Sequence, residues 1–218
     1  MLFMFGIAFC AFSNMATSFL GQIFSFFNID YNVEMPESPK GIFGFLLVCI
    51  STVLVPALAE EFACRGLVLG LLRKFGDGFA IIMSALLFGL MHGNFEQIPF
   101  AFLVGLVLGF VTVKSGSIWV AVAIHAFNNG ISVFAEYALS SFSQQAQNIC
   151  IILIFTACML AGLVAFLFCG NDEKDLFVLK KDELTATETQ KYKWFLTSAP
   201  IIIFIIITVL ESLSFFVI

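Results

Sequence analysis

The sequence is short of charge. Only 11% of its 218 residues are Asp, Glu, Lys or Arg, whereas about 25% of residues are charged in a typical soluble domain. Hydrophobic residues make up 61% of the chain, and the mean hydropathy is +1.04. These values exclude an ordinary soluble domain. The ten Lys and Arg residues form no basic patch, so the sequence gives no sign of a nucleic-acid partner.

Several catalytic and metal-binding motifs are missing as well. The six cysteines include no CxxC pair, so we interpret them as small buried hydrophobic residues. There is no HExxH sequence, which excludes the helix of the zincin proteases. There is no GxSxG sequence, which excludes the nucleophile turn of the serine hydrolases. The lack of an internal repeat makes a small transporter or channel a weaker hypothesis.

Long apolar runs are what the sequence does contain. A run of about 18 or more apolar residues predicts a transmembrane helix, because each residue rises about 1.5 Å through a hydrocarbon core of about 30 Å. The runs are continuous rather than alternating, which favours helices over a β-barrel. We therefore predict an all-α polytopic membrane protein, a single transmembrane domain over residues 1–218 with about seven transmembrane helices. The predicted segments cover roughly 2–27, 41–75, 78–93, 97–114, 117–139, 147–170 and 194–218.

The polar loops indicate how the chain crosses the membrane. Segment 41–75 is too long for one ideal crossing and contains Pro56, which predicts either two half-spans or one long kinked helix. With a single crossing, the positive-inside rule places Arg73–Lys74, Lys114 and the lysine-rich 171–193 loop on the cytoplasmic side. This arrangement predicts an N-terminus inside and a C-terminus outside the membrane, which we expect to be a bacterial plasma membrane.

The first apolar segment starts at the second residue of the chain. It has no positively charged region before it and is too long for a signal-peptide core, so we predict a retained span. A chain that starts almost directly in a span is expected of a shortened member of a larger family.

Ionisable residues inside the apolar segments are the main functional signal, because each charge costs about 2.5 kcal/mol or more at a helix centre. In the first such group, Glu61 and Arg65 are four residues apart on one helix face and can pair. Glu60 points about 100° away, so it remains free to act as a general base. The structural alternative is a buried salt bridge that only fixes helix packing, which leaves the adjacent glutamate unexplained.

The only two histidines of the chain lie in the other two groups. Phe88 and His92 share a helix face, although a histidine near a helix end is by itself more often structural. His125 and Asn129 also share a face, and their donors can converge on a developing oxyanion. Asn128 lies about 100° off that face, so Asn129 is the preferred residue. The alternative for this pair is ordinary hydrogen bonding between helices.

Together these residues offer a base, an imidazole that orients water, and an oxyanion site. No serine has a convincing adjacent base. The chemistry that this combination favours is attack by activated water on a carbonyl, which means hydrolysis of a peptide bond within or beside the membrane.

In this order, the three groups resemble the motifs of the CPBP family of intramembrane proteases. That family includes the type II CAAX prenyl endopeptidases and the bacterial Abi, or bacteriocin-processing and self-immunity, proteins. Its motifs are Glu-Glu-x-x-x-Arg, Phe-x-x-x-His and His-x-x-x-Asn/Asp. Here they are Glu60–Glu61…Arg65, Phe88…His92 and His125…Asn129. The stretch 114–119 also looks like the family, and the motif-bearing core covers about 45–135.

The resemblance implies a helical membrane fold with a polar intramembrane cavity and an endopeptidase activity on a membrane-associated peptide or protein. It implies that Glu60 and His92 activate water, that His125 and Asn129 stabilise the oxyanion, and that Glu61, Arg65 and Phe88 support the site. We favour a mechanism without a metal ion for this chain.

Zinc is kept as an alternative because the family is often described as metalloproteases, and Glu60, His92 and His125 would be its ligands.

Two questions stay open from the sequence. A non-catalytic immunity or regulatory protein that binds through the same cavity is the alternative function. Counting residues along the spans also places Glu60 toward the cytoplasmic end of its helix and His92 toward the outer end of its own. Tilt, a break at Pro56 or a re-entrant 78–93 segment would have to bring them together.

Overall fold

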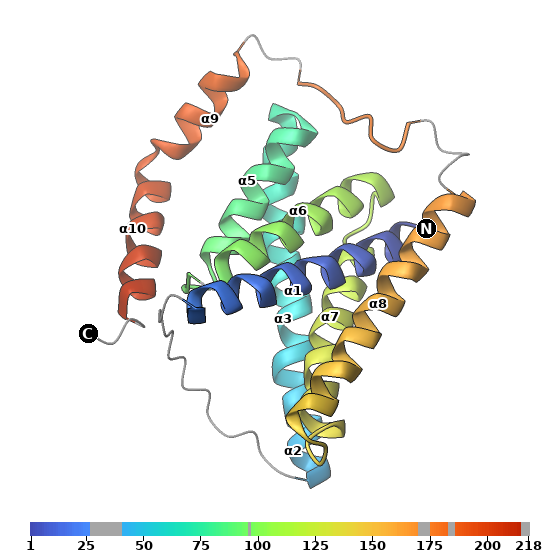
Figure 1. Cartoon of the computed structure of the whole chain (residues 1–218). Helices are drawn as coiled ribbons and strands as arrows, with labels where there is room; N and C mark the ends of the chain where they lie inside the picture. Colours follow the sequence, from blue (N-terminus) through green and yellow to red (C-terminus); the bar gives the residue numbers. More distant parts are fainter. Residues whose placement is uncertain (27–40, 96, 170–174, 183–185, 215–218) are drawn as a thin grey trace.

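The computed structural model describes residues 1–26, 41–95, 97–169, 175–182 and 186–214, and its regular structure there is entirely helical. Figure 1 shows α1 crossing a bundle of steeper helices, with α9 and α10 to one side of α5. The helices are α1 (Leu2–Phe26), α2 (Gly41–Val48), η1 (Cys49–Leu54), α3 (Val55–Glu61), η2 (Phe62–Leu69), α4 (Gly70–Leu72), η3 (Arg73–Phe75), α5 (Asp77–Leu90), α6 (Gln97–Ser115), α7 (Ile118–Ala138), α8 (Gln144–Cys169), α9 (Glu188–Leu196) and α10 (Ala199–Ser214).

Fewer helices are long enough to cross a membrane than the apolar runs predict. By length and composition, five described helices qualify, or six if α9 and α10 count as one span bent by 62°. The difference comes mainly from α5. It has 14 residues, which at about 1.5 Å per residue is shorter than a hydrocarbon core of about 30 Å. The several long apolar helices are consistent with an integral membrane protein, and the described residues contain five or six candidate spans where the sequence predicts about seven.

The segment from Gly41 to Phe75 forms one continuous helical run of 35 residues. Pro56 does not split it into half-spans. Wide π-helical turns precede this proline in η1 and follow Glu61 in η2. Proline lacks an N–H group, and its ring collides with the carbonyl four residues earlier, which is that of Thr52. Local widening of the helix is one way to accommodate both effects.

The core lies where α1, α6 and α7 meet. Its buried members include Ile7, Leu108 and Ile124, the last two fully buried. Helices α5 and α6 approach closely at Gly105, where an added Cβ would come within 3.0 Å of the Ala85 Cα. Any larger residue at position 105 would separate the two helices. This contact fixes α5, and with it the turn that carries His92.

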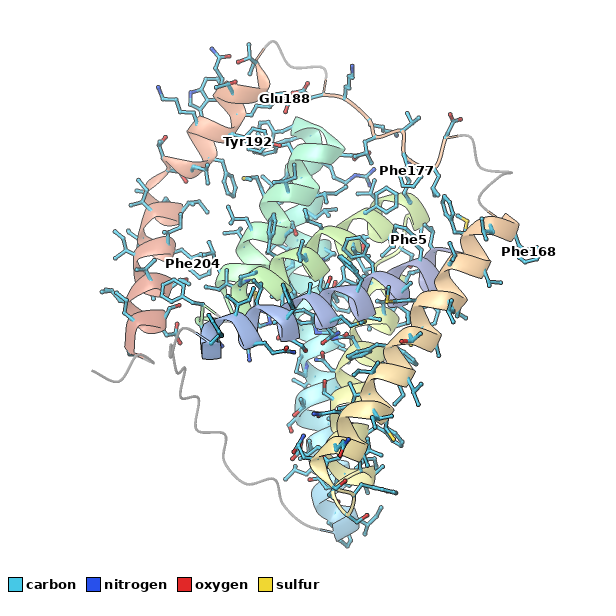
Figure 2. All side chains as sticks on the ribbon, in the orientation of Figure 1. Phe5, Phe168, Phe177, Glu188, Tyr192 and Phe204 are labelled. Atoms are coloured by element: carbon cyan, nitrogen blue, oxygen red, sulfur yellow. The ribbon has the colours of Figure 1, made fainter. Side chains whose placement is uncertain are left out.

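A second set of polar contacts lies at one end of the bundle. We call Arg73, Asp77, Asp182, Glu188 and Lys191 the end cluster. Arg73 Nε donates to Asp77 Oδ1 at 2.8 Å, and Lys191 Nζ donates to Asp182 Oδ2 at 2.7 Å, to Glu188 and to the Phe75 carbonyl. Figure 2 shows Glu188 on α9 near the end of α5.

Lys114 also contacts the loop beside this end. Its Nζ donates to the carbonyls of Asp175 and Val178, and the Lys180 amide donates to Asp77 Oδ2 at 3.1 Å. The basic segments that were expected to share one side of the membrane therefore lie at one end of the bundle. That this end faces the cytoplasm stays a prediction.

Candidate active site

The three motifs meet at one pocket. Its volume is about 70 Å³, and its lining comes from α3, α5, the turn after α5, α6 and α7. The lining residues are Glu60, Phe88, His92, Phe100, Ala101, Val104, His125, Asn128 and Asn129. The conflict between Glu60 and His92 disappears for two reasons. Glu60 lies near the middle of a 35-residue helix, and α5 is short, so His92 follows it within the bundle rather than at its outer surface.

Glu61 and Arg65 form the expected ion pair, and both are almost fully buried. Arg65 Nη1 donates to Glu61 Oε1 at 2.8 Å, and Arg65 Nη2 donates to the Gly105 carbonyl at 3.1 Å. The guanidinium carbon also lies 4.3 Å from the centre of the Phe88 ring, a cation–π contact. Arg65 therefore joins η2 to α5 and α6. A buried charge of this kind needs its partner, since an uncompensated one is strongly destabilising.

His125 lies between the two glutamates. Its Nδ1 is 2.8 Å from Glu61 Oε1, and its Nε2 is 3.9 Å from Glu60 Oε2. The Glu61 carboxylate is paired with Arg65 and can only accept a hydrogen bond, so His125 donates through Nδ1–H. This leaves Nε2 directed toward the pocket. We call Glu60, Glu61, Arg65 and His125 the pocket cluster.

His92 lies in the turn after α5 and is oriented in the same way. Its Nδ1 is 2.9 Å from the Phe88 carbonyl oxygen, which can only accept, so Nδ1 carries the proton. In the neutral ring, Nε2 is then an acceptor. The Phe88 ring makes edge contacts with both imidazoles, with centroid distances of 5.1 Å to His92 and 5.8 Å to His125. Phe88 thus supports both histidines.

The carboxamides differ from the expectation in one respect. Asn129 lines the pocket as expected, but Asn128 lines it too, although its helical position was expected to direct it elsewhere. The pocket lies beside α7 rather than directly over one residue of it, so side chains about 100° apart both reach its wall. Asn129 Nδ2 donates to the Thr52 carbonyl at 3.0 Å.

Pro56 favours that last contact, because it has no amide hydrogen that could compete for the Thr52 carbonyl. In a regular α-helix, the amide of residue 56 would donate to the carbonyl of Thr52, but proline has no amide hydrogen. Residue 56 therefore cannot donate to this carbonyl, which accepts from Asn129 Nδ2. The proline that sequence reasoning treated only as a kink has a second role, as the residue that provides an anchor for Asn129.

Asn14 on α1 is a neighbour of the site that the motifs did not indicate. Its Nδ2 donates to Asn128 Oδ1 at 2.8 Å. The available signal was a carboxamide in the middle of an apolar span, which costs free energy unless a partner satisfies it.

The pocket cluster is incompletely paired. Glu60 Oε2, Glu61 Oε2 and Arg65 Nε are buried and have no hydrogen-bond partner among the described residues. A pocket of about 70 Å³ can hold water, since one molecule needs at least about 10–15 Å³. It is too small for a peptide, so a substrate would present only its reacting carbonyl to it.

The pocket does not show a metal-ligand set. Among the described residues, no group of three or more His, Cys, Asp or Glu side chains is arranged to hold a metal ion. Glu60, His92 and His125 line one pocket without forming such a group. The zinc alternative lacks its ligand geometry there.

Two larger pockets, of about 300 and 440 Å³, share Phe5 and Phe177 and are lined by apolar residues. Figure 2 shows both phenylalanines in this region, between α1 and the loop after α8. Neither lining contains an ionisable or nucleophilic side chain. The smaller pocket is therefore the candidate active site.

The comparison with protein families supports this location. Residues 42–131 match the family model described as type II CAAX prenyl endopeptidase Rce1-like. Over these residues, less than half of the chain, the sequence is similar to the Rce1-like family. The matched region contains all three motifs and every residue of the pocket lining, whereas α1, with Asn14, lies outside it. No curated protein and no solved structure matches the chain.

Proposed function

We propose that this chain is an intramembrane endopeptidase that hydrolyses a peptide bond of a membrane-associated substrate with activated water. The observation that carries the proposal is the lining of the 70 Å³ pocket. It combines acceptors that can take a proton from water with carboxamide donors that can stabilise an oxyanion. The name of the Rce1-like family supports a prenylated CAAX peptide as the substrate class.

Glu60 is the general base in this proposal. Its Oε2 atom is buried and has no hydrogen-bond partner in the part of the chain that the structure describes, so it is available to accept a proton from a water molecule in the pocket. His92 presents an unprotonated Nε2 and accepts the second water hydrogen, which orients the oxygen toward the substrate carbonyl. Proton transfer to a positioned base contributes about 100-fold to 10,000-fold to a rate.

The oxyanion is stabilised from α7. The water oxygen adds to the carbonyl carbon, and the carbonyl oxygen takes the negative charge. With a proton on Nε2, His125 donates to that oxygen, and Asn129 donates through its second amide hydrogen. Because Glu60 has taken the water proton and is neutral in that state, the negative charges of Glu61 and of the oxyanion balance the positive charges of Arg65 and of the doubly protonated His125. Glu61 and Arg65 therefore act as supporting residues that balance charge.

The final step returns the proton. The carbon–nitrogen bond breaks as the tetrahedral intermediate collapses, and the proton held by Glu60 passes to the leaving amine. Water has then been divided between the two products, with its oxygen and one hydrogen in the new carboxyl group and the other hydrogen on the amine. No covalent enzyme intermediate is needed, and the described lining of the pocket contains no serine.

The test uses purified protein in liposomes and a farnesylated peptide with a CAAX C-terminus, with the same peptide lacking farnesyl as a second substrate. We expect the wild type to release fragments detected by mass spectrometry, and the Glu60→Ala and His92→Ala variants to remain folded without releasing them. Cleavage of both peptides would show that the substrate does not need the prenyl group, and it would leave the proposed hydrolysis intact. If the variants cleave at the wild-type rate, or the wild type cleaves neither peptide, the proposal is wrong and a binding role becomes the better account.

We further propose that the protein lies in a bacterial plasma membrane with the end cluster on the cytoplasmic side. The clustering of Lys114, Lys180 and Lys191 at one end of the bundle supports this orientation through the positive-inside rule. Labelling of single cysteines placed at either end, from outside intact cells, would test it.

A further inference from the structure

A chain of hydrogen-bonded carboxamides connects α1 to the pocket wall. Asn14 Nδ2 donates to the Cys10 carbonyl at 2.9 Å and to Asn128 Oδ1 at 2.8 Å. Asn128 Nδ2 is 3.5 Å from Asn129 Oδ1, and Asn129 Nδ2 donates to the Thr52 carbonyl at 3.0 Å. This series of hydrogen-bonded carboxamides thus begins and ends at backbone carbonyls on two different helices, α1 and η1.

The two carbonyls determine how each carboxamide is turned. A backbone carbonyl can only accept, so the Asn14 atom that contacts Cys10 is its nitrogen, and the Asn128 atom facing it is an oxygen. The Thr52 carbonyl requires a nitrogen of Asn129 in the same way, which leaves the Asn129 oxygen facing the nitrogen of Asn128. Both ends therefore impose the same donor-to-acceptor direction on the series of carboxamides. Reversing one carboxamide would place two oxygens or two nitrogens against each other.

We infer that Asn14 is a positioning residue for the oxyanion site, and that Asn128 is a second oxyanion donor beside Asn129. This inference rests on the proposed function. By holding the oxygen of Asn128, Asn14 keeps the amide nitrogen of Asn128 on the pocket side, where its second hydrogen is free for the substrate oxygen. Asn14 itself does not line the pocket, so it acts only through Asn128.

A role in the active site explains why Asn14 lies where a polar side chain costs free energy. It lies in the middle of the candidate span Leu2–Ile23, where a polar side chain is expensive unless it serves a site. It also lies outside the family match at 42–131, so the match gives no indication of it. A span that precedes the matched region thereby contributes to the active site.

The experiment measures kcat and KM for the farnesylated peptide in the wild type and in Asn14 variants. Asn14→Ala leaves Asn128 free to rotate, and we expect kcat to fall about fivefold to tenfold with little change in KM, the effect of one lost hydrogen bond. Asn14→Asp offers only acceptors and draws the nitrogen of Asn128 away from the pocket. We expect it to lower kcat about 100-fold, the effect of losing an oxyanion donor.

A double-variant comparison separates positioning from a loss of folding. In the Asn128→Ala background, neither Asn14 substitution should lower kcat further, because the group that Asn14 orients is gone. Thr17→Ala is the matched control, since Thr17 Oγ1 donates only within its own helix, to the Ser13 carbonyl at 3.0 Å, and it should cleave like the wild type.

The inference is overturned if Asn14→Asp behaves like Thr17→Ala, if the Asn14 and Asn128 losses multiply in the double variant, or if only KM changes. Each of these results leaves the proposed function intact provided that the wild type cleaves and Glu60→Ala does not. If the wild type itself fails to cleave, the proposed function fails and this inference falls with it.

Discussion

The pocket cluster and the end cluster both join helices through charged side chains, but they differ in how completely their atoms are paired. Three buried atoms of the pocket cluster have no partner among the described residues. In the end cluster, Lys191 Nζ donates to three acceptors, and both oxygens of Asp77 accept hydrogen bonds. Buried polar groups are normally paired, and an exception in a native structure requires an explanation. The difference fits the proposed function, in which the end cluster stabilises the fold and the unpaired atoms of the pocket cluster are available to a reacting molecule.

The largest effect on stability is expected from removing the central cation of the pocket cluster. Arg65→Met leaves Glu61 buried without a counter-charge and should destabilise the protein by about 3–5 kcal/mol. The matched variant is Arg73→Met, whose side chain is 38% exposed, and screening should limit its effect to less than about 1 kcal/mol. Chemical unfolding in micelles measures both. Equal losses would remove the distinction between the two clusters.

The next effect concerns catalysis. His125→Gln removes the group that lies between Glu60 and Glu61 and should lower kcat about 100-fold to 1,000-fold, the usual effect of an oxyanion donor. KM should change little, because the interaction is made in the transition state. Steady-state cleavage of the farnesylated peptide gives both constants. A rise in KM at constant kcat would instead assign His125 to substrate binding.

A smaller effect is expected at Pro56. Pro56→Ala restores an amide that can donate to the Thr52 carbonyl and compete with Asn129. We expect kcat to fall about fivefold, the effect of about 1 kcal/mol for one hydrogen bond, while the protein unfolds no more easily because a helix-interior proline has been removed. Parallel cleavage and unfolding measurements test this. Loss of stability together with activity would mean that the proline serves the fold alone.

The smallest effect on cleavage is expected from the end cluster. Lys191→Met should lower the unfolding temperature, because its three acceptors lose their donor. Cleavage by the folded protein should stay within about twofold of the wild type, since the end cluster shares no residue with the pocket. Activity assays below the unfolding temperature distinguish the two effects. A large loss of kcat would show that the end cluster is coupled to the site.

Local contacts of the site could be predicted from the sequence, and distant ones could not. Glu61 with Arg65 and Phe88 with His92 are four residues apart on helices, so spacing alone brings them together. Asn14 and Asn128 are 114 residues apart, and no pattern in either segment shows that α1 packs against α7. The smaller number of candidate spans among the described helices has a similar cause, because hydropathy does not reveal where a helix ends inside an apolar run. The end of α5 is marked by Gly93, whose φ of 66° lies in the left-handed region that favours glycine.

The most direct test compares one carboxylate from each cluster in the same assay. Glu60→Gln and Asp182→Asn are both isosteric, and single-turnover cleavage of the farnesylated peptide is measured for each beside its unfolding temperature. We predict that Glu60→Gln loses about 100-fold to 10,000-fold in rate and remains as stable as the wild type, while Asp182→Asn is less stable and cleaves normally. Normal cleavage by folded Glu60→Gln would contradict the account.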